Sequence, residues 1–524
     1  MAGAIDRLET KRLALQADLD AGKSQADRNR LGQFATPPAL SLDILNYAAT
    51  LLPPGEKVRF LDPGFGTGAF YSALRRVIPK SRIANALSFE IDPHYGRPAA
   101  RLWRKAGLTL RLTDFTHATA TPRFNLVICN PPYVRHHHLE NGEKIRLQLR
   151  TRAASGIDLS GLAGLYCHFL GLSHAWMSPD GIAGWLIPSE FMDVNYGRAV
   201  KRYLLSRVTL VHIHRFDPND VQFADALVSS AVVWFRNAPP PPDHQVTFTF
   251  GGTLRAPKNS RVVPAKELAH EPKWTRFPVA DIRSRTSIPI VADFFRIKRG
   301  LATGDNRYFI LDASAIAGRG LPMAAFRPIL PSPRYVSENV IDADKHGNPT
   351  LERRLYLLDP RLPEDEIARR FPVLAAYLEE GKARDLHKRY LCSHRSPWYA
   401  QEDRPAPPIV CTYLGRRDTA SGRPFRFILN NSQATVANVY LAMYPTPLLA
   451  RALAADAQLI RRVWQALNDI TAEQLIGEGR VYGGGLHKLE PRELANVPVP
   501  QIMNLLPRHT RPPKQGEMFA ESLS

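Results

Sequence analysis

The fold is decided by the stretch Asp62-Pro63-Gly64-Phe65-Gly66-Thr67-Gly68-Ala69-Phe70, which follows a short apolar run at 58–61. The apolar run predicts a strand, and the residues after the turn predict a helix. Glycines between a strand and a helix let a ligand approach the backbone closely, because they carry no side chain. The stretch therefore predicts a cofactor site at the end of the first strand of an α/β sheet, bordered by Gly64, Gly66 and Gly68.

Asp62 narrows the chemistry of that cofactor. Dinucleotide enzymes set a related glycine pattern against a pyrophosphate, and a carboxylate directly before the turn would repel that group. The same carboxylate is a good partner for the cationic amino group of an amino acid. The turn therefore favours S-adenosylmethionine (SAM) over a nucleotide diphosphate.

Helical patterns and short apolar runs alternate on both sides of the turn. This alternation predicts a Rossmann-like α/β domain with a mostly parallel, doubly wound sheet. Leucines at near-helical spacing among charges over residues 5–30 predict a helical arm, residues 1–29, that packs on this domain. The expected strands lie at 58–61, 87–91, 108–112, 124–129, 182–187, 210–214 and 228–235, with a helix over 160–177.

Acidic residues end the next two expected strands. Glu90 lies where a carboxylate can accept hydrogen bonds from both hydroxyls of a ribose. Asp114 can accept from the amino group of a cofactor adenine, and Phe115 can stack on that ring. A strand-end acid alone is ordinary, but these two follow the glycine turn in order.

The fourth expected strand ends in Asn130-Pro131-Pro132-Tyr133. The prolines fix the backbone and remove competing amide donors, so the Asn130 side-chain oxygen and the Pro131 carbonyl form a pair of acceptors. Such a pair suits an NH2 group, whose lone pair becomes more available when two acceptors draw the nitrogen towards a tetrahedral geometry. Where this NH2 group belongs to a nucleobase, such as adenine, Tyr133 is expected to stack on that base.

These motifs, preceded by Gln33-Phe34-Ala35-Thr36-Pro37-Pro38, resemble in their order the gamma-class amino-methyltransferases of restriction-modification systems, the TaqI-type N6-adenine DNA methylases. The resemblance covers residues 30–236. It implies methyl transfer from SAM to the N6 of an adenine that is flipped out of double-stranded DNA. A separately encoded restriction endonuclease would be the enzyme's partner in such a system.

The resemblance also implies roles for two further residues. Thr36 would contact the methionine part of SAM. Phe223 precedes Val228-Ser229-Ser230-Ala231-Val232 as the second base-stacking aromatic of the family does. Asp62 stands where the prototype has Glu, which keeps the charge.

A proline run at 237–243 (NAPPPPD) cannot continue a central strand or helix, so a domain boundary is expected there. The catalytic domain is then 30–237, and a mixed α+β DNA target-recognition domain spans 238–524. Within it, 363–381 predicts a helix broken at Pro372, and 448–469 predicts another. The segments 297–304 and 480–486 loosely resemble the family's target-recognition region. A basic cluster is formed by Arg416, Arg417, Arg423 and Arg426, either to hold phosphate or read guanine, or as a solvated face.

The composition is consistent with a DNA partner. The chain has 524 residues, a net charge of +20 and a pI near 9.9, so its field attracts polyanions. No signal peptide or long apolar run is evident, which favours a cytoplasmic, nucleoid-associated enzyme without a membrane partner. We expect the enzyme to be a monomer. The widely spaced Cys129, Cys167, Cys392 and Cys411 are expected to be reduced and buried.

No metal is expected, although His136-His137-His138 follows the Asn-Pro-Pro-Tyr motif. Consecutive histidines cannot all point one way, and methyl transfer needs no metal. Two alternatives to adenine methylation stay open. Cytosine N4 carries the same NH2 chemistry, and so does a protein glutamine amide, although the large basic region after the catalytic core favours DNA.

Overall fold

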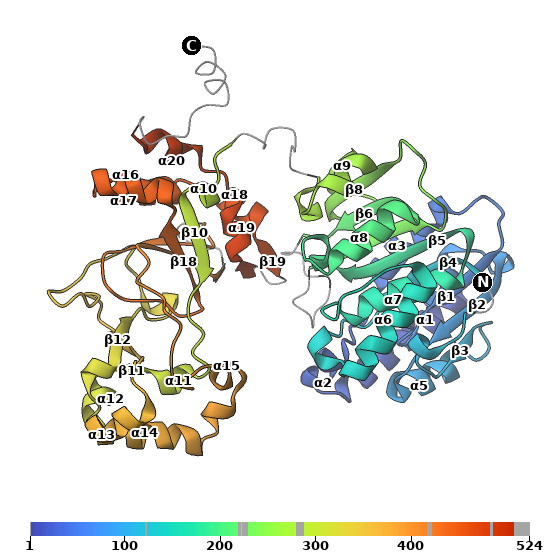
Figure 1. Ribbon diagram of the computed structural model, residues 1–524. Coiled ribbons are helices and arrows are strands. Elements are labelled where there is room, and N and C mark those ends of the chain that lie inside the picture. The colour runs from blue at the N-terminus through green and yellow to red at the C-terminus, as the bar shows by residue number, and fades with distance from the viewer. Residues whose placement is uncertain are drawn as a thin grey trace, which may run out of the picture. The chain divides into compact units, whose positions relative to one another are not determined.

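The computed structural model describes residues 2–120, 123–217, 222, 229–278, 288–416, 422–482 and 486–507. The chain divides into two compact units, the first formed mainly by Met1–Asp281 and the second mainly by Ile282–Val481 and the residues after Gly485. Each unit is described by itself (Figure 1).

The first unit is built on a sheet of nine strands in the described residues, in the order β3-β2-β1-β4-β5-β7-β6-β8-β9. The first five strands in this order are parallel, and β7 runs antiparallel to both β5 and β6. The strand bounds are β1 Val58–Asp62, β2 Ile83–Phe89, β3 Thr109–Arg111, β4 Phe124–Cys129, β5 Met177–Pro188, β6 Thr209–Arg215, β7 Ser230–Arg236, β8 Gln245–Gly252 and β9 Pro257–Pro264.

Both faces of this sheet are covered, as the doubly wound expectation requires. Phe60 and Ile128 belong to a core cluster on one face that also holds residues of α3 and α4. The alternate residues Leu61 and Val127 are equally buried. Two-sided burial explains why the strands are continuous apolar runs. The helices are α1 Ala2–Ala21, α2 Gln25–Leu31, α3 Pro38–Leu51, α4 Ala69–Val77, α5 Pro93–Trp103, α6 Asn141–Ser155, α7 Leu165–Ser173, α8 Gly197–Ser206 and α9 Ala265–His270.

The domain boundary expected at Asn237 is wrong. The prolines do end β7 at Arg236, but the chain then returns as β8, which pairs in parallel with β6 through His212–Arg215. β9 pairs with β8 in turn. A proline run ends a strand because it removes backbone donors, but it leaves the neighbouring edge free to take another strand. The first unit therefore continues to Asp281.

The N-terminal arm packs on the domain as expected, but it forms two helices. Ser24 caps α2 by accepting a hydrogen bond from the Asp27 amide at 3.1 Å, and this cap separates α2 from α1. The buried Arg12 of α1 donates to Glu9 and reaches Thr67 of the glycine turn at 3.2 Å. The arm is therefore joined to the turn that the sequence places at the centre of the site.

The second unit has the mixed α+β character that the sequence predicts. Its main sheet has the order β10-β18-β15-β17-β13 in the described residues, and smaller sheets join β11-β14-β12 and β16-β20-β19. Its strands are β10 Phe295–Arg299, β11 Ile310–Asp312, β12 Phe326–Ile329, β13 Val340–Ile341, β14 Leu355–Leu358, β15 Ile409–Thr412, β16 Leu414–Arg416, β17 Phe427–Asn430, β18 Tyr440–Pro445, β19 Arg480–Tyr482 and β20 Leu486–Lys488.

The expected helices of this unit are both interrupted. The first breaks before Pro372 as predicted, and the second divides because 456–458 leave the helical conformation. The helices are α10 Val291–Phe294, α11 Asn306–Phe309, α12 Ala313–Gly318, α13 Glu364–Arg370, α14 Pro372–Ala383, α15 Tyr390–Ser393, α16 Pro447–Ala455, α17 Leu459–Asn468, α18 Ala472–Glu478, α19 Pro491–Ala495 and α20 Pro500–Leu505.

All four cysteines are buried and free, which confirms the expectation for them. Among the described residues, no helix has the length and apolar character needed to cross a membrane.

Candidate active site

A cavity of about 500 Å3 lies at the carboxyl ends of β1, β2 and β4. The strand order reverses between β1 and β4, and in open α/β sheets such a reversal is where ligands bind. The cavity brings together seven of the residues singled out from the sequence: Gly64, Gly66, Glu90, Asp114, Phe115, Asn130 and Pro132.

Asp62 ends β1 and is fully buried beneath the glycine turn. One carboxylate oxygen, Oδ1, accepts a hydrogen bond from the Gly64 amide at 3.1 Å. The other, Oδ2, is buried and has no hydrogen-bond partner among the described residues. Burial raises the pKa of Asp62 to about 8, and the nearby Glu90 carboxylate adds to this rise. An acid in this state gains from any cation that reaches Oδ2.

The glycines of the turn have different physical roles. A Cβ on Gly64 would lie 3.2 Å from the backbone oxygen of Asn130, so the turn can approach the β4 end only without a side chain. Gly66 has a φ of +56° and lines the cavity. Gly68, with a φ of +95°, does not line it, because a Cβ there would meet the rings of Phe65 and Trp103. Gly68 therefore serves the packing of α4.

Glu90 is held by two backbone donors. The Gly66 amide donates to Oε2 and the Asp92 amide to Oε1, each at 2.8 Å. Burial raises the pKa of Glu90, although these hydrogen bonds oppose the rise. Each carboxylate oxygen can accept more than one hydrogen bond, so Glu90 presents acceptor capacity to the cavity on which it borders.

Asp114 and Phe115 form the opposite end of the cavity. Asp114 accepts a hydrogen bond from the Thr116 amide at 2.7 Å, which fixes the direction of its carboxylate. The ring of Phe115 packs against Phe89 and Phe169, each with 5.3 Å between ring centroids. A planar apolar wall therefore lies beside an oriented acceptor.

Asn130 is oriented by the segment that precedes α3. Its Nδ2 donates to the Phe34 carbonyl at 3.0 Å and to the Thr36 hydroxyl oxygen at 3.1 Å. A backbone carbonyl can only accept, so the amide nitrogen must face Phe34 and the amide oxygen must face away. That oxygen, Oδ1, is buried and has no hydrogen-bond partner in the part of the chain that the structure describes. The site thus holds an acceptor that is available to a donor group of a ligand.

Tyr133 is fixed at the end of the same motif. Its hydroxyl donates to the Leu186 carbonyl at 3.1 Å. The residue is 9% exposed, and the centre of its ring lies 5.7 Å from that of the Phe34 ring. The Tyr133 amide donates to the Gly32 carbonyl at 3.2 Å. Tyr133, Pro131, Thr36 and Asp62 lie behind the cavity wall and do not line it. Phe223 lies outside the described residues.

Comparison with known proteins agrees with this arrangement. Residues 99–222 match the family described as Eco57I restriction-modification methylase, and residues 274–520 match the C-terminal domain of the type II methyltransferase M.Eco57I. The chain belongs to the restriction-modification methylases.

Two curated relatives span nearly the whole methylase. The type II methyltransferase M.XamI of Xanthomonas campestris pv. amaranthicola is 28% identical over 491 residues, which cover 91% of this chain and 86% of the relative. M.AccI of Acinetobacter calcoaceticus is 25% identical over 501 residues, covering 92% and 87%. The solved structure of the restriction-modification enzyme MmeI in complex with DNA has a TM-score of 0.47 at 11% identity, covering 86% of this chain and 64% of that one.

The arm of the methylase adds residues to the cavity that sequence reasoning missed. Gln16, Asp20 and Lys23 line it. Lys23 donates to Asp92 and, at 3.0 Å, to Gln33. Charged residues among leucines indicate a solvated helix face, and that pattern concealed their role. The position of the arm directly before the Gln33 motif was the available signal.

Tyr95 of α5 joins the same wall. Its hydroxyl donates to Asp20 at 2.8 Å, and the Lys23 ammonium lies 5.2 Å from the centre of its ring. The arm is therefore held to the end of β2 by an acid, a cation and an aromatic ring, next to Glu90.

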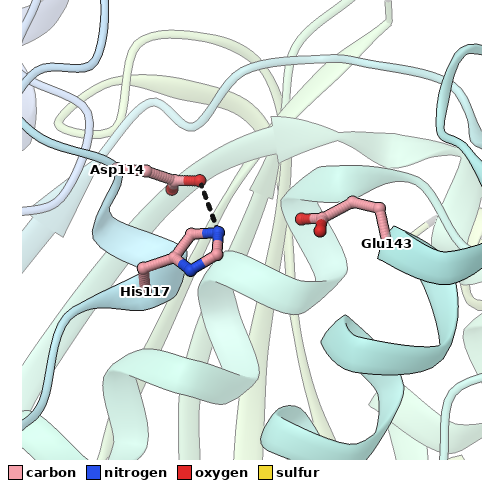
Figure 2. Close-up of side chains that lie close together, drawn as sticks. All are labelled: Asp114, His117 and Glu143. Atoms are coloured by element: carbon pink, nitrogen blue, oxygen red, sulfur yellow. Dashed lines mark ion pairs between the residues drawn. The ribbon is translucent and has the colours of Figure 1, made fainter.

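Asp114, His117 and Glu143 lie close enough together to raise the question of a metal site (Figure 2). Glu143, however, forms an ion pair with Arg146, whose Nε donates to it at 2.8 Å, and Arg146 also donates to Thr116. A guanidinium that already neutralises the carboxylate disfavours a cation there. We assign no metal to this cluster, nor to His136–His138, which form an exposed turn before α6.

The sequence left two alternatives for the basic cluster, a DNA contact or a solvated face, and two of its four arginines instead make contacts within the protein. Arg426 donates to the carbonyls of Val336, Ser337 and Glu338 at 2.7–2.9 Å. Arg423 donates to the Asn468 carbonyl. Arg426 therefore braces a loop within the second unit and has little capacity left for a ligand, whereas Arg423 is joined to the last residue of α17. Arg416 is exposed on β16, and Arg417 lies outside the described residues.

The state of Asp62 predicts how stability depends on pH. Its pKa is 3.8 in an unfolded reference and about 8 in the fold, so between these values the folded protein retains a proton that the unfolded chain has lost. The contribution of Asp62 to the free energy of unfolding therefore falls as the pH rises from about 4 to about 8. Asp62→Asn should gain stability relative to wild type over this range, by at most about 1.4 kcal/mol per pH unit.

Urea unfolding of the ligand-free protein at pH 5, 6, 7 and 8 measures this effect. Asp18→Asn, which changes an exposed aspartate of α1, is the matched control. Any constant offset caused by the new amide cancels, because only the change with pH is compared. Parallel curves for Asp62→Asn and wild type would show that Asp62 is ionised in the fold.

Proposed function

We propose that this methylase transfers the methyl group of SAM to the N6 nitrogen of an adenine that is flipped out of double-stranded DNA. The observation that carries the proposal is the buried, unpartnered Oδ1 of Asn130, held in place by Phe34 and Thr36. A buried acceptor without a partner costs about 1–3 kcal/mol, so its retention at a cavity indicates a ligand that donates to it.

The residues around the cavity fit SAM. The unpartnered Oδ2 of Asp62 suits the cationic amino group of the methionine part. Glu90 can accept from the two ribose hydroxyls, while Asp114 and Phe115 can hold the adenine. The cavity, at about 500 Å3, lies within the usual range for cofactor sites. Bound SAM would supply an electrophilic methyl group.

Asn130 and Pro131 then prepare the nucleophile. The amino group of adenine is a poor nucleophile because its lone pair is delocalised into the ring. Two accepting oxygens, Oδ1 of Asn130 and the Pro131 carbonyl, draw its hydrogens towards a tetrahedral arrangement and make the lone pair available. The amide geometry is fixed before the base arrives, so little reorganisation is needed, and the remaining demand is alignment.

Tyr133 is the expected stacking partner of the target base, with Phe223 opposite. The hydroxyl of Tyr133 is anchored to Leu186, so its ring is held in one orientation. Adenine N6 cannot be reached within the stacked duplex, and an aromatic surface stabilises the base once it is extruded. The high net charge, +20, supports DNA over a protein glutamine as the substrate.

The second unit is the proposed target-recognition part of the enzyme. The family that it matches is the C-terminal domain of a type II methyltransferase. The segment 297–304 includes the last residues of β10, and the segment 480–486 includes β19 and the first residue of β20. We further propose that the enzyme acts as a monomer and protects DNA against a separately encoded cognate endonuclease.

A product assay tests the proposed function. Purified methylase, SAM carrying an isotopically labelled methyl group, and duplex DNA are incubated, and the nucleosides are separated after hydrolysis. We expect the label in N6-methyladenine. Label in N4-methylcytosine would replace adenine with cytosine, and label in protein alone would refute a DNA substrate.

The contribution of the arm to cofactor binding is a separate expectation. Lys23→Ala removes the cation that holds Asp92 and Gln33, so the wall beside Glu90 loosens. The Kd for SAM should rise about tenfold, the equivalent of one charge-assisted hydrogen bond. Isothermal titration calorimetry with SAM measures the Kd of the variant and of wild type.

Lys11→Ala is the matched control, since Lys11 is an exposed lysine on the same helix and does not line the cavity. Its Kd should equal that of wild type. Equal affinities for the Lys23→Ala variant and wild type would show that the arm only covers the domain.

A further inference from the structure

An exposed tyrosine in the second unit carries two guanidinium groups over its ring. Tyr335 is 47% exposed. The guanidinium carbon of Arg334 lies 4.6 Å from the centre of its ring, and that of Arg353 lies 4.4 Å from it. Both distances are within the range of a cation–π interaction. We refer to Arg334, Tyr335 and Arg353 as the arginine–tyrosine cluster.

Neither arginine of the cluster is neutralised. Within the described part of the chain, Arg334 and Arg353 form no ion pair or hydrogen bond, although Glu338 and Glu352 lie in the same two segments. Hydrogen bonds at the start of α12 lower the pKa of Asp312, and the positive charge of Arg353 lowers it further. Asp312 and Arg353 nevertheless form no ion pair in the described part of the chain. Two like charges at one ring repel each other, and an anion bound by either guanidinium would relieve the repulsion.

The loop that presents the cluster is held rigidly. Before it, the buried Tyr440 hydroxyl donates to the Pro331 carbonyl at 2.8 Å. After it, Val336 is buried in a core cluster, and Arg426 binds the carbonyls of Val336, Ser337 and Glu338. Arg426, for which the sequence left open a DNA contact or a solvated face, is therefore the positioning residue for this loop. Such bracing means that little entropy is lost when the cluster meets a ligand.

The geometry points to a DNA contact, and we propose that the arginine–tyrosine cluster binds the substrate duplex. A guanidinium that lies over an aromatic ring keeps its edge free, and that edge forms two parallel hydrogen bonds with a phosphate or with O6 and N7 of guanine. A phosphate and the edge of a guanine both present a pair of hydrogen-bond acceptors with negative potential to the guanidinium group. The proposal rests on the proposed function, since it names the part of the second unit that holds the DNA.

Binding to duplex DNA tests the proposal. The DNA is a fluorescein-labelled duplex with the sequence context at which the wild-type enzyme methylates, and a second duplex of unrelated sequence. Fluorescence anisotropy gives Kd at several salt concentrations. The double variant Arg334→Ala/Arg353→Ala should bind the first duplex at least tenfold more weakly. If the contacts are to phosphates, both duplexes lose affinity and the slope of log K against log salt falls by about 1.8. If they are to guanine, the loss is confined to the first duplex.

Two further variants separate shape from charge. Arg334→Lys/Arg353→Lys keeps both charges but loses the planar fork, so it should retain the salt slope and still bind more weakly than wild type. Arg369→Ala/Arg370→Ala removes the same two charges from α13, where Asp365 and Glu366 neutralise them, and should bind as wild type does. The Kd for SAM and the unfolding curve of each variant check that the fold is intact.

Alanine variants that bind both duplexes as tightly as the α13 control would overturn the proposal. The proposed function is decided by a different result, which is whether the wild-type enzyme methylates and binds DNA. Should the wild-type enzyme methylate DNA while the alanine variant binds it normally, only the cluster assignment fails. Should the wild-type enzyme neither methylate nor bind DNA, the proposed function itself fails.

Discussion

The site depends on the two hydrogen bonds that the Asn130 amide nitrogen donates to Phe34 and Thr36. They use the donor end of the amide within the protein and leave the acceptor end, Oδ1, without a partner among the described residues, in a side chain that lines the cavity. They also join a segment before α3 to the end of β4, 94 to 96 residues apart in the chain. The backbone bond from Tyr133 to Gly32 strengthens the same connection. Without it, Asn130 could turn over and present a donor.

Burial of carboxylates is the second constraint on the site. Asp62 and Glu90 lie near each other under the glycine turn, and burial raises the pKa of both. Only Glu90 has a backbone donor for each of its oxygens. The fold thus keeps at Asp62 a carboxyl group whose ionised form is unfavourable unless a cation lies beside it, as is common where binding has been favoured over stability.

Much of this could be predicted from the sequence, because the signals are local. Strand β4 runs over the residues expected for it, and Glu90, Asp114 and Asn130 end consecutive strands, which parallel topology must bring to one edge. The contacts of Gln16, Asp20 and Lys23 could not be predicted in this way. They reach residues 51 to 75 positions away, and helical periodicity shows only which face of a helix is polar. The return of the chain as β8 was missed for a related reason, since an open sheet edge leaves no mark in the sequence.

Arginines in the second unit show the same limit. The sequence alone does not distinguish Arg426 from Arg334. In the structure, Arg426 donates to backbone carbonyls and fixes a loop, whereas Arg334 lies over a tyrosine ring. What separates them is the set of acceptors that the fold places nearby. A role in DNA binding therefore has to be argued from contacts and not from charge.

The role of Asn130 is tested most directly by measuring both the rate of methyl transfer and the affinity for SAM in the variant Asn130→Ala. If Asn130 acts on the target amino group, the single-turnover rate of DNA methylation should fall on the order of 100-fold or more, which is typical for the loss of one preorganised polar group, while the Kd for SAM stays within about twofold of wild type. An unchanged rate, or an equal loss of rate and cofactor affinity, would contradict it.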